Sequence, residues 1–452
     1  MKSQSSLQPN EIEEISAALQ EANQAFIRHY PGESNRRQAV HTVYGGAHLF
    51  KADSTARLGA VALRSLEEYA PDFATLAGAL GVTGDSHLWE PIYQRIVEKL
   101  RREPVEDFRL DFEDGYGNRA DEEEDGHAAS AAEEVARGLT ENSLPPFIGI
   151  RIKPLNEDLR ARSLRTLDIF VSTLTKATDG KLPPNFVVTV PKVQLPAQMT
   201  AAVRLFELLE KKTGLTNGAL RIEPMIETPQ AIINQRGEVA LGSLVEAAEG
   251  RCGSVHFGVY DYTASCGITA AYQTMGHPAC DFARQMMLVS LAGTGIHLSD
   301  GATNILPVGP YRAIERESLT NDQQQGNRDA VHAAWQLGFN DNLHSLRTGF
   351  YQGWDLHPAQ LVTRYAAVFA FFLGGLETAS NRLKTFVEKA ALASLFGDVF
   401  DDAATGQGLL NFFLRGIACG AITEEEALAT GLTIEEIRSR SFYKILEGRR
   451  LA

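Results

Sequence analysis

Short apolar stretches with strand character alternate along this chain with longer segments whose apolar residues recur at helical spacing. Strict alternation of strands and helices favours a parallel sheet, and eight strands favour a closed barrel. The sequence therefore predicts an α/β fold of the TIM (β/α)8 barrel type. The expected strands cover residues 41–46, 108–114, 147–152, 186–193, 221–227, 254–261, 295–301 and 347–351.

The two ends of the chain have helical patterns only. Apolar residues recur near helical spacing from Pro9 to about Tyr30, and the pattern after Pro358 is helical to the end. We expect an N-terminal helical extension (1–40) that packs as an appendage, and a TIM-barrel catalytic domain (41–365). A C-terminal helical region (366–452) is expected to form a lid or a second appendage.

Charge and cysteine content narrow the classes of function. The 452 residues include 43 Lys and Arg against 57 Asp and Glu, a net charge of -14. Proteins that bind nucleic acid or a membrane surface depend on basic patches, so this balance argues against both. The 4 cysteines have no zinc-ligand spacing, and Met1–Asn10 has no signal-peptide apolar core. We expect a soluble, cytoplasmic protein with free thiols.

Two neighbouring expected strands each end in an acidic residue, Glu227 and Asp261. The carboxyl ends of barrel strands are where chemistry is carried out. Two carboxylates there suit Mg²⁺ or Mn²⁺, which prefer oxygen ligands and keep waters for a substrate to displace. The alternative is a pair of surface acids stabilised by helix N-termini. Gly258 favours the metal site, because a glycine lets the backbone come close to whatever Asp261 holds.

Other expected strand ends carry further charged residues. Arg151 either forms a structural ion pair with an acid or directs its bidentate guanidinium group at a substrate carboxylate or enolate. Its expected ion-pair partners are Glu113 and Asp114. Lys192 is either a Schiff-base lysine or, as we favour beside a metal site, a charge-balancing one.

Three more polar residues lie on the expected strands or at their ends. Asp300 and His357 complete the ring of polar groups at the ends of strands seven and eight, and we expect a structural role for His357. Glu223 is either an acid that supports the site, an acid that faces solvent or a member of a buried ion pair.

A set of motifs at the expected strand ends resembles a known superfamily, that of the citrate lyase β-subunit, malyl-CoA lyase and 2-oxo-acid aldolases. The resemblance covers roughly residues 40–365. The motifs, in chain order, are Leu110–Asp114, Ile150–Ile152, Pro191–Val193, Ile226–Pro229, Phe257–Asp261 and Gly353–Gln360.

This resemblance implies a divalent-metal-dependent carbon–carbon lyase or aldolase that forms an enolate. Its substrate would be a small 2-oxo or 3-hydroxy acid or its CoA thioester. By motif position, Glu227 and Asp261 are the metal ligands and Arg151 faces the substrate carboxylate and the enolate, supported by Glu113 and Asp114. The resemblance also implies a homo-oligomer whose C-terminal region closes a neighbour's site.

Two other interpretations of the same residues stay open. The Glu-Pro-Met-Ile-Glu-Thr-Pro stretch at 223–229 also resembles barrels that use phosphoenolpyruvate, which suggests a phosphotransferase. A barrel that binds a metabolite without turnover is the third possibility. The general base is unassigned among Asp300, Asp355 and a metal-bound water.

Overall fold

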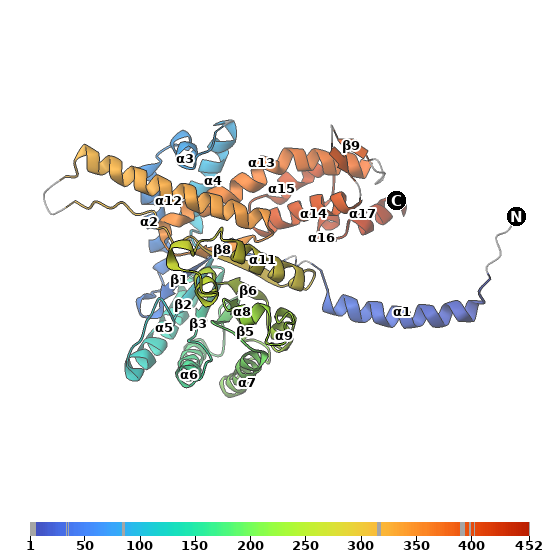
Figure 1. The fold of residues 1–452 in the computed structure, drawn as a ribbon, viewed down its shortest axis with the longest axis horizontal. Coiled ribbons are helices and arrows are strands. Elements are labelled where there is room, and N and C mark those ends of the chain that lie inside the picture. The colour runs from blue at the N-terminus through green and yellow to red at the C-terminus, as the bar shows by residue number, and fades with distance from the viewer. Residues whose placement is uncertain are drawn as a thin grey trace.

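Eight parallel strands close into a barrel in the computed structural model, which confirms the predicted TIM-barrel fold (Figure 1). The strands are β1 (His41–Gly46), β2 (Asp107–Asp111), β3 (Phe147–Arg151), β4 (Phe186–Val190), β5 (Arg221–Ile226), β6 (Ser254–Phe257), β7 (His297–Ala302) and β8 (Gln352–Asp355). The structure describes residues 6–32, 34, 36–83, 86–313, 318–388, 394–396, 399–401 and 403–451.

The predicted eighth strand, at 347–351, is wrong. Helix α12 (Asn321–Arg347) occupies its start, and β8 begins at Gln352 after a turn at Thr348 and Gly349. Gly349 has a φ of 90°, a left-handed conformation that ends the helix, and no feature of residues 347–351 signals this turn. The sixth strand is also shorter than predicted, because it ends at Phe257 and Asp261 lies in the following helix α10 (Val259–Ser265).

Helices cover the outside of the barrel, and α5, α6 and α7 lie along one side of it in Figure 1. Each has an apolar stripe that packs on the strands, as in α4, where Ile92, Ile96 and Leu100 are buried at helical spacing. The remaining helices between strands are α2 (Ser54–Tyr69), α3 (Phe73–Ala79), α4 (Trp89–Arg102), α5 (Asp121–Glu141), α6 (Arg160–Ala177), α7 (Pro196–Thr213), α8 (Pro229–Ile232), α9 (Leu241–Glu246) and α11 (Pro278–Leu291).

The barrel interior is unusually polar. Most TIM barrels fill this space with branched apolar side chains, whereas here Asp107, Arg109 and Asp111 are all buried at alternate positions of β2. Arg109 pairs with Asp107 and with Glu223 of β5, at 3.2 Å from the latter. Buried charges require such partners, so each charged side chain of this network is paired inside the barrel.

The C-terminal helices extend the barrel at the amino-terminal end of its strands. The backbone N–H of Gln38, just before β1, donates to Ala418 of α14 (Ala403–Ala418) at 3.1 Å. Tyr365 of α13 (Leu361–Glu388) donates to the carbonyl of Pro104, just before β2, at 3.0 Å. The short helices α15 (Glu424–Ala427), α16 (Ile434–Arg438) and α17 (Phe442–Leu451) complete this region. The C-terminal region therefore packs as an appendage at the end of its own barrel opposite to Glu227 and Asp261.

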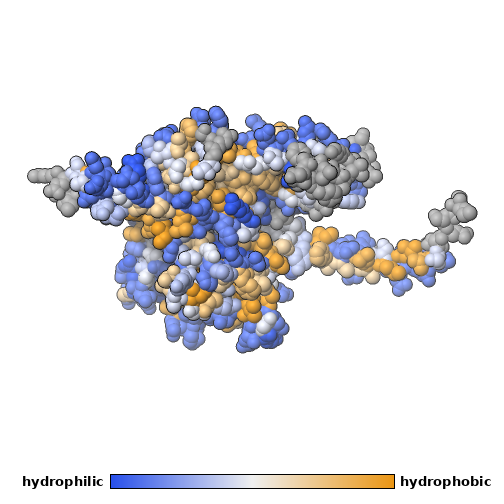
Figure 2. Space-filling view, turned by 45° about the horizontal axis from the view of Figure 1, so that its top comes forward, coloured by the Kyte–Doolittle hydropathy of each residue, from blue (hydrophilic) through white to orange (hydrophobic). Residues whose placement is uncertain are grey.

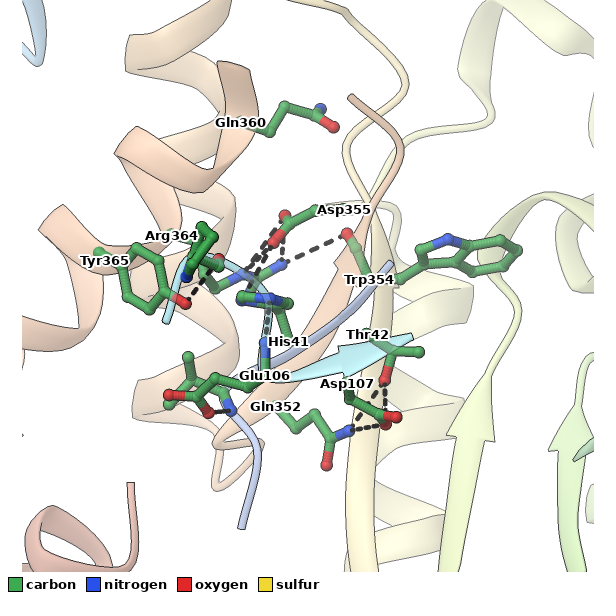
Figure 3. A network of polar contacts seen from close by, with 12 residues as sticks. His41, Thr42, Glu106, Asp107, Gln352, Trp354, Asp355, Gln360, Arg364 and Tyr365 are labelled. Atoms are coloured by element: carbon green, nitrogen blue, oxygen red, sulfur yellow. Dashed lines mark hydrogen bonds and ion pairs between the residues drawn. The ribbon is translucent and has the colours of Figure 1, made fainter. Parts of the chain in front are cut away.

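Helix α13 joins the C-terminal region to the barrel without interruption. The boundary predicted between residues 365 and 366 lies inside this helix. Arg364 of α13 bonds to Asp355 of β8 at 3.0 Å, and His41 of β1 lies beside the same carboxylate (Figure 3). Residues 358–388 form a helical stretch long and apolar enough to cross a membrane, but 67% of its most apolar window is buried inside the protein.

The N-terminal helix α1 (Pro9–His29) projects from the rest of the chain (Figure 1). The prediction that it packs against the rest of the chain is wrong, and Figure 2 shows hydrophobic residues along this projecting helix. Ile15, Phe26 and Ile27 are each more than half exposed. Its connection to the barrel is anchored where the Gly32 backbone N–H donates to Gly293 at 2.8 Å.

Candidate active site

Lys192 lies at the centre of a cluster of carboxylates at the carboxyl ends of the strands. Its ammonium Nζ contacts a Glu113 oxygen and lies 3.1 Å from Asp261 Oδ2 and 3.5 Å from Asp114 Oδ2. Its backbone N–H donates to Glu227 Oε1 at 2.6 Å. The residues predicted from four separate strand ends therefore meet at one place.

The backbone at Lys192 makes this double contact possible. Lys192 follows Pro191 at the end of β4 and has a φ of 51°, in the left-handed region that residues with a side chain rarely adopt. This conformation turns both the N–H and the side chain towards the acids. Backbone strain of this kind clusters at functional sites, so the geometry supports a functional role for this position.

Carboxylates surround the Lys192 ammonium, as expected for a charge-balancing residue. The surrounding acids Glu227, Glu113 and Asp261 raise its pKa above the ordinary value and outweigh the effect of burial. A Schiff-base lysine needs the opposite shift, because only the neutral amine attacks a carbonyl. The alternative favoured from the sequence fits the structure.

Glu227 is almost completely buried, with 1% of its surface exposed. Burial raises its pKa to about 8, and the charges of Asp261 and Glu113 add to this effect while Lys192 opposes it. A β-carbon at residue 258 would lie 2.3 Å from Glu227 Oε2, so Gly258 is required for this packing. Gly258 thus permits the close approach of Glu227 to the backbone, whereas the glycine was expected to make room for a ligand of Asp261.

Arg151 is held by three acids of one segment. Its Nε and Nη2 donate to Asp111 at 2.7 and 2.5 Å, and its Nη1 lies 3.0 Å from Glu113 and 3.7 Å from Asp114. The predicted partners Glu113 and Asp114 are present, but the bidentate partner is Asp111. Alternation along β2 signals this, because residues 107, 109 and 111 face the same side of the sheet.

Two aromatic residues that sequence reasoning missed fix the orientation of Arg151. Its guanidinium carbon lies 4.8 Å from the ring centre of Tyr44 and 5.3 Å from that of Trp354. Cation–π contacts of this kind favour the charged planar group. Arg151 is thereby a rigid, permanently charged group beside Glu113, which also contacts Lys192.

The donor set fits a divalent cation that keeps part of its shell for other ligands. Glu227 is a buried carboxylate whose negative charge Lys192 compensates only in part, and Asp261 reaches the same place from α10 with 38% of its side chain exposed. The described part of the chain has no group of three or more His, Cys, Asp or Glu residues that could hold a metal ion. Two carboxylates are enough for Mg²⁺, because water and substrate often complete its shell.

The residues considered as general bases are engaged elsewhere. Asp300 is fully buried and bonds to Arg284 at 2.8 Å and to the Ser345 hydroxyl at 2.5 Å. Asp355 is bonded to Arg364. Because both carboxylates are bound by arginine inside the fold, neither is placed to accept a proton from a substrate.

Two other sequence alternatives are decided by the structure. His357 caps the 3₁₀ turn at 358–360 by accepting from the Ala359 N–H at 3.2 Å, a structural role as expected. Glu223 belongs to a buried ion pair with Arg109, on the same strand as the segment that leads to Glu227.

Below Arg151, His256 is buried with Tyr44 Oη 3.0 Å from its Nδ1 and Thr42 Oγ1 3.3 Å from its Nε2. Burial and the charges of Arg109 and Arg151 lower its pKa to about 4, against the opposing effect of Glu223. Between pH 6.5 and 4 the unfolded chain therefore binds a proton at this residue that the folded chain does not. Stability contributed by neutral His256 is present above pH 6.5 and is lost as pH falls towards 4.

Between pH 6.5 and 4, His256 should lower the free energy of unfolding of the unaltered chain by about 1.4 kcal/mol for each unit that the pH falls. We expect His256→Gln to lack this contribution. Urea unfolding at several pH values between 4 and 7 measures the slope. His29→Gln, on exposed α1, is the matched control. An unchanged slope in His256→Gln would contradict the assignment.

Comparisons with known proteins place the chain in a family without an assigned function. It belongs to the family described as a domain of unknown function (DUF6986), which matches residues 19–445. No curated protein matches the chain in sequence.

Among solved structures, a citrate lyase from Burkholderia xenovorans is similar over 87% of this chain and 96% of its own, at 17% identity and a TM-score of 0.55. The CitE protein from Mycobacterium tuberculosis, solved with magnesium, acetoacetate and coenzyme A, is similar over 86% and 100%, at 14% identity and a TM-score of 0.46. A Haloferax volcanii malate synthase, solved with magnesium and glyoxylate, is similar over 92% and 97%, at 16% identity and a TM-score of 0.46. The first similarity confirms, at the level of fold, the resemblance to the citrate lyase superfamily.

Proposed function

We propose that this protein is a Mg²⁺-dependent (or Mn²⁺-dependent) carbon–carbon lyase or aldolase that acts on a small 2-oxo or 3-hydroxy acid, or on its CoA thioester, through an enolate. The observation that carries the proposal is the convergence of Glu227, Asp261 and Arg151 at one mouth of the barrel, connected through Lys192 and Glu113. The fold shared with a citrate lyase agrees with this reaction class.

In the proposed reaction the bond between the α-carbon and a neighbouring carbonyl or carbinol carbon breaks or forms. On cleavage next to a carbinol carbon, the carbinol hydroxyl loses its proton and becomes a carbonyl group. The electron pair of the broken bond stays with the α-carbon fragment and is delocalised onto its carbonyl oxygen as an enolate, which is then protonated at the α-carbon. Glu227 and Asp261 would hold the divalent cation, which supplies Lewis-acid stabilisation of that oxygen. Arg151 supplies a second, preorganised positive charge that needs no reorganisation during the reaction.

The acids around Arg151 have distinct tasks in this scheme. Asp111 binds two nitrogens of the guanidinium and sets its plane. Glu113 contacts both Arg151 and Lys192, and burial raises its pKa. Glu113 thereby links the two positive charges of the proposed site, Arg151 and Lys192.

An enolisation assay tests the proposal with small fragments in place of a complete substrate. Pyruvate, 2-oxobutyrate and acetyl-CoA are incubated in D₂O with Mg²⁺ and the protein, and proton NMR follows loss of the α-proton signals. We expect exchange with at least one compound, dependent on Mg²⁺ and absent in Glu227→Gln. Cleavage of 2-hydroxy and 3-hydroxy di- and tricarboxylic acids and their CoA thioesters is then followed by the same method.

The assay also separates the two alternative functions. Transfer of phosphate from phosphoenolpyruvate, followed by phosphorus NMR, would favour a phosphotransferase. Binding of a 2-oxo acid without exchange or cleavage would favour a barrel that binds a metabolite only. Either result, with no α-proton exchange in any compound, contradicts the lyase.

We propose in addition that the protein is a homo-oligomer in which a second copy covers α1. The apolar residues Ile15, Phe26 and Ile27 are exposed on a helix that bears four glutamates, which disfavours an anionic membrane surface as its partner. We expect the full chain to sediment as an oligomer and a chain without residues 1–30 to form smaller assemblies with an unchanged barrel. A monomeric full-length chain at micromolar concentration would contradict this.

A further inference from the structure

A recess of about 120 Å³ opens at the amino-terminal end of the barrel, the end opposite to Glu227 and Asp261. The first residues of several strands line it, among them Arg221 of β5 and His297 of β7, together with Arg36 from the segment before β1. Arg221 and Glu227 lie at opposite ends of β5, roughly 20 Å apart at about 3.3 Å per residue. This recess is therefore separate from the candidate active site.

The acids deep in the recess already have cationic partners. Glu223 accepts from Arg109 at 3.2 Å and from Thr189 at 2.8 Å, and Asp107 pairs with the same arginine. Arg37, at the rim, is paired with Glu103 and lies 3.1 Å from Glu106. Glu103 and Glu106 are matched by Arg37 and Lys99, whereas Glu223 and Asp107 share the one Arg109. Two further arginines at the recess have no carboxylate within ion-pair distance among the described residues.

Those two arginines are Arg36 and Arg221. Among the residues that the structure describes, neither lies within ion-pair distance of a carboxylate, and the Arg36 side chain bonds only to the Ser34 hydroxyl at 3.4 Å. The Arg221 guanidinium is partly buried beside Gly253, where a β-carbon would lie 3.7 Å from Nη2. Burial lowers the Arg221 pKa, and the positive charge of Arg36 lowers it further. Two like charges thus approach each other in a partly dehydrated recess.

His297 adds a neutral hydrogen-bonding group to the same recess. Burial lowers its pKa to about 4, with further lowering by Arg415 and Arg36, so the ring is uncharged at neutral pH. A neutral imidazole can donate one hydrogen bond from a ring nitrogen. Arg415 comes from α14, so the C-terminal appendage contributes positive potential here as well.

We propose that this recess is a binding site for a small oxyanion with two negative charges, of the phosphate class, held by Arg36 and Arg221 and by a hydrogen bond from His297. A chain with a net charge of -14 has no general excess of positive charge, so uncompensated arginines that converge in a recess indicate a specific anion. Guanidinium groups match the oxygen geometry of phosphate. The volume admits free phosphate or the phosphate end of a phosphomonoester at the open rim.

Isothermal titration calorimetry with sodium phosphate, at constant ionic strength set by sodium chloride, tests the site. We expect the full-length protein to bind phosphate at millimolar concentration or tighter, and Arg221→Gln and Arg36→Gln each to bind about tenfold or more weakly. Arg64→Gln removes the same charge from an exposed position on α2 and is expected to bind as the unaltered chain does. Arg36 is exposed, so its variant tests the site even where Arg221→Gln does not fold.

Glycerol phosphate and succinate, titrated in parallel, identify the source of the anion. Tighter binding of glycerol phosphate than of phosphate supports a phosphomonoester, the reverse order supports free phosphate, and preference for succinate overturns the phosphate class. Glu227→Gln is expected to retain phosphate binding, which separates this site from the candidate active site. No binding at 10 mM phosphate, roughly a hundred times weaker than a typical metabolite site, or binding by both arginine variants equal to that of the unaltered chain, overturns the proposal.

Discussion

A Glu227→Gln protein is expected to bind Mg²⁺ at least about a hundredfold more weakly than the unaltered chain, and to lose about a thousandfold or more in turnover. Loss of a group that only supports a metal ligand already costs roughly tenfold to a hundredfold in affinity. Loss of a ligand itself should cost more. Glutamine keeps the shape of the side chain against Gly258 and can still accept a hydrogen bond from the Lys192 N–H.

Calorimetric titration with Mg²⁺, or electron paramagnetic resonance with Mn²⁺, measures this effect. Glu238→Gln is the matched control, because Glu238 is an exposed acid whose partners are Asn234 and Arg236. Burial raises the pKa of Glu227 to about 8, so its ionised form costs stability in the metal-free protein as pH rises from the unfolded value towards 8. Glutamine resembles the protonated form, and we expect the variant to be at least as stable as the unaltered chain at pH 8. Unchanged Mg²⁺ affinity would remove the basis of the proposed function.

An Arg151→Lys protein is expected to retain Mg²⁺ binding while its turnover falls by about a hundredfold or more. Loss of one preorganised donor to a developing oxyanion costs roughly 10²–10³ in rate. Lysine keeps the positive charge but cannot bond to Asp111 through two nitrogens and still direct a third towards Glu113. Steady-state kinetics on whichever compound shows α-proton exchange should place the loss in kcat.

Arg109→Lys is the matched control for this substitution. Arg109 is also buried and also paired with acids, but it lies deeper in the barrel, bonded to Asp107 and Glu223. We expect a loss of thermal stability in both variants, because each disrupts a buried ion pair, and a large loss of turnover in Arg151→Lys alone. Equal losses of turnover in the two variants would show that Arg151 has only a structural role.

The sequence alone determined the class of fold and the residues of the candidate site. Alternating strand and helix patterns are local properties of the chain, and β1 and β3 follow the predicted ranges closely. Glu113, Lys192 and Glu227 could be placed at one mouth because parallel strands present their carboxyl ends at the same edge. That inference depends on the order of the strands and not on any contact between side chains.

Only the tertiary structure decided which contacts those residues make with one another. The left-handed backbone at Lys192 and the side of α10 from which Asp261 reaches it depend on packing and are not signalled by local patterns. Asp300 pairs with Arg284 and Asp355 pairs with Arg364, and these contacts also depend on tertiary packing. They exclude both aspartates as general bases.

The same holds for the arrangement of the chain ends and for the recess at the far end of the barrel. Arg36 and Arg221 are far apart in the sequence and meet only because the barrel closes. The C-terminal helices have ordinary apolar patterns that do not specify which end of the barrel they cover. Contacts between residues distant in the chain depend on how buried surfaces and charges fit together, and hydrophobic periodicity does not specify them.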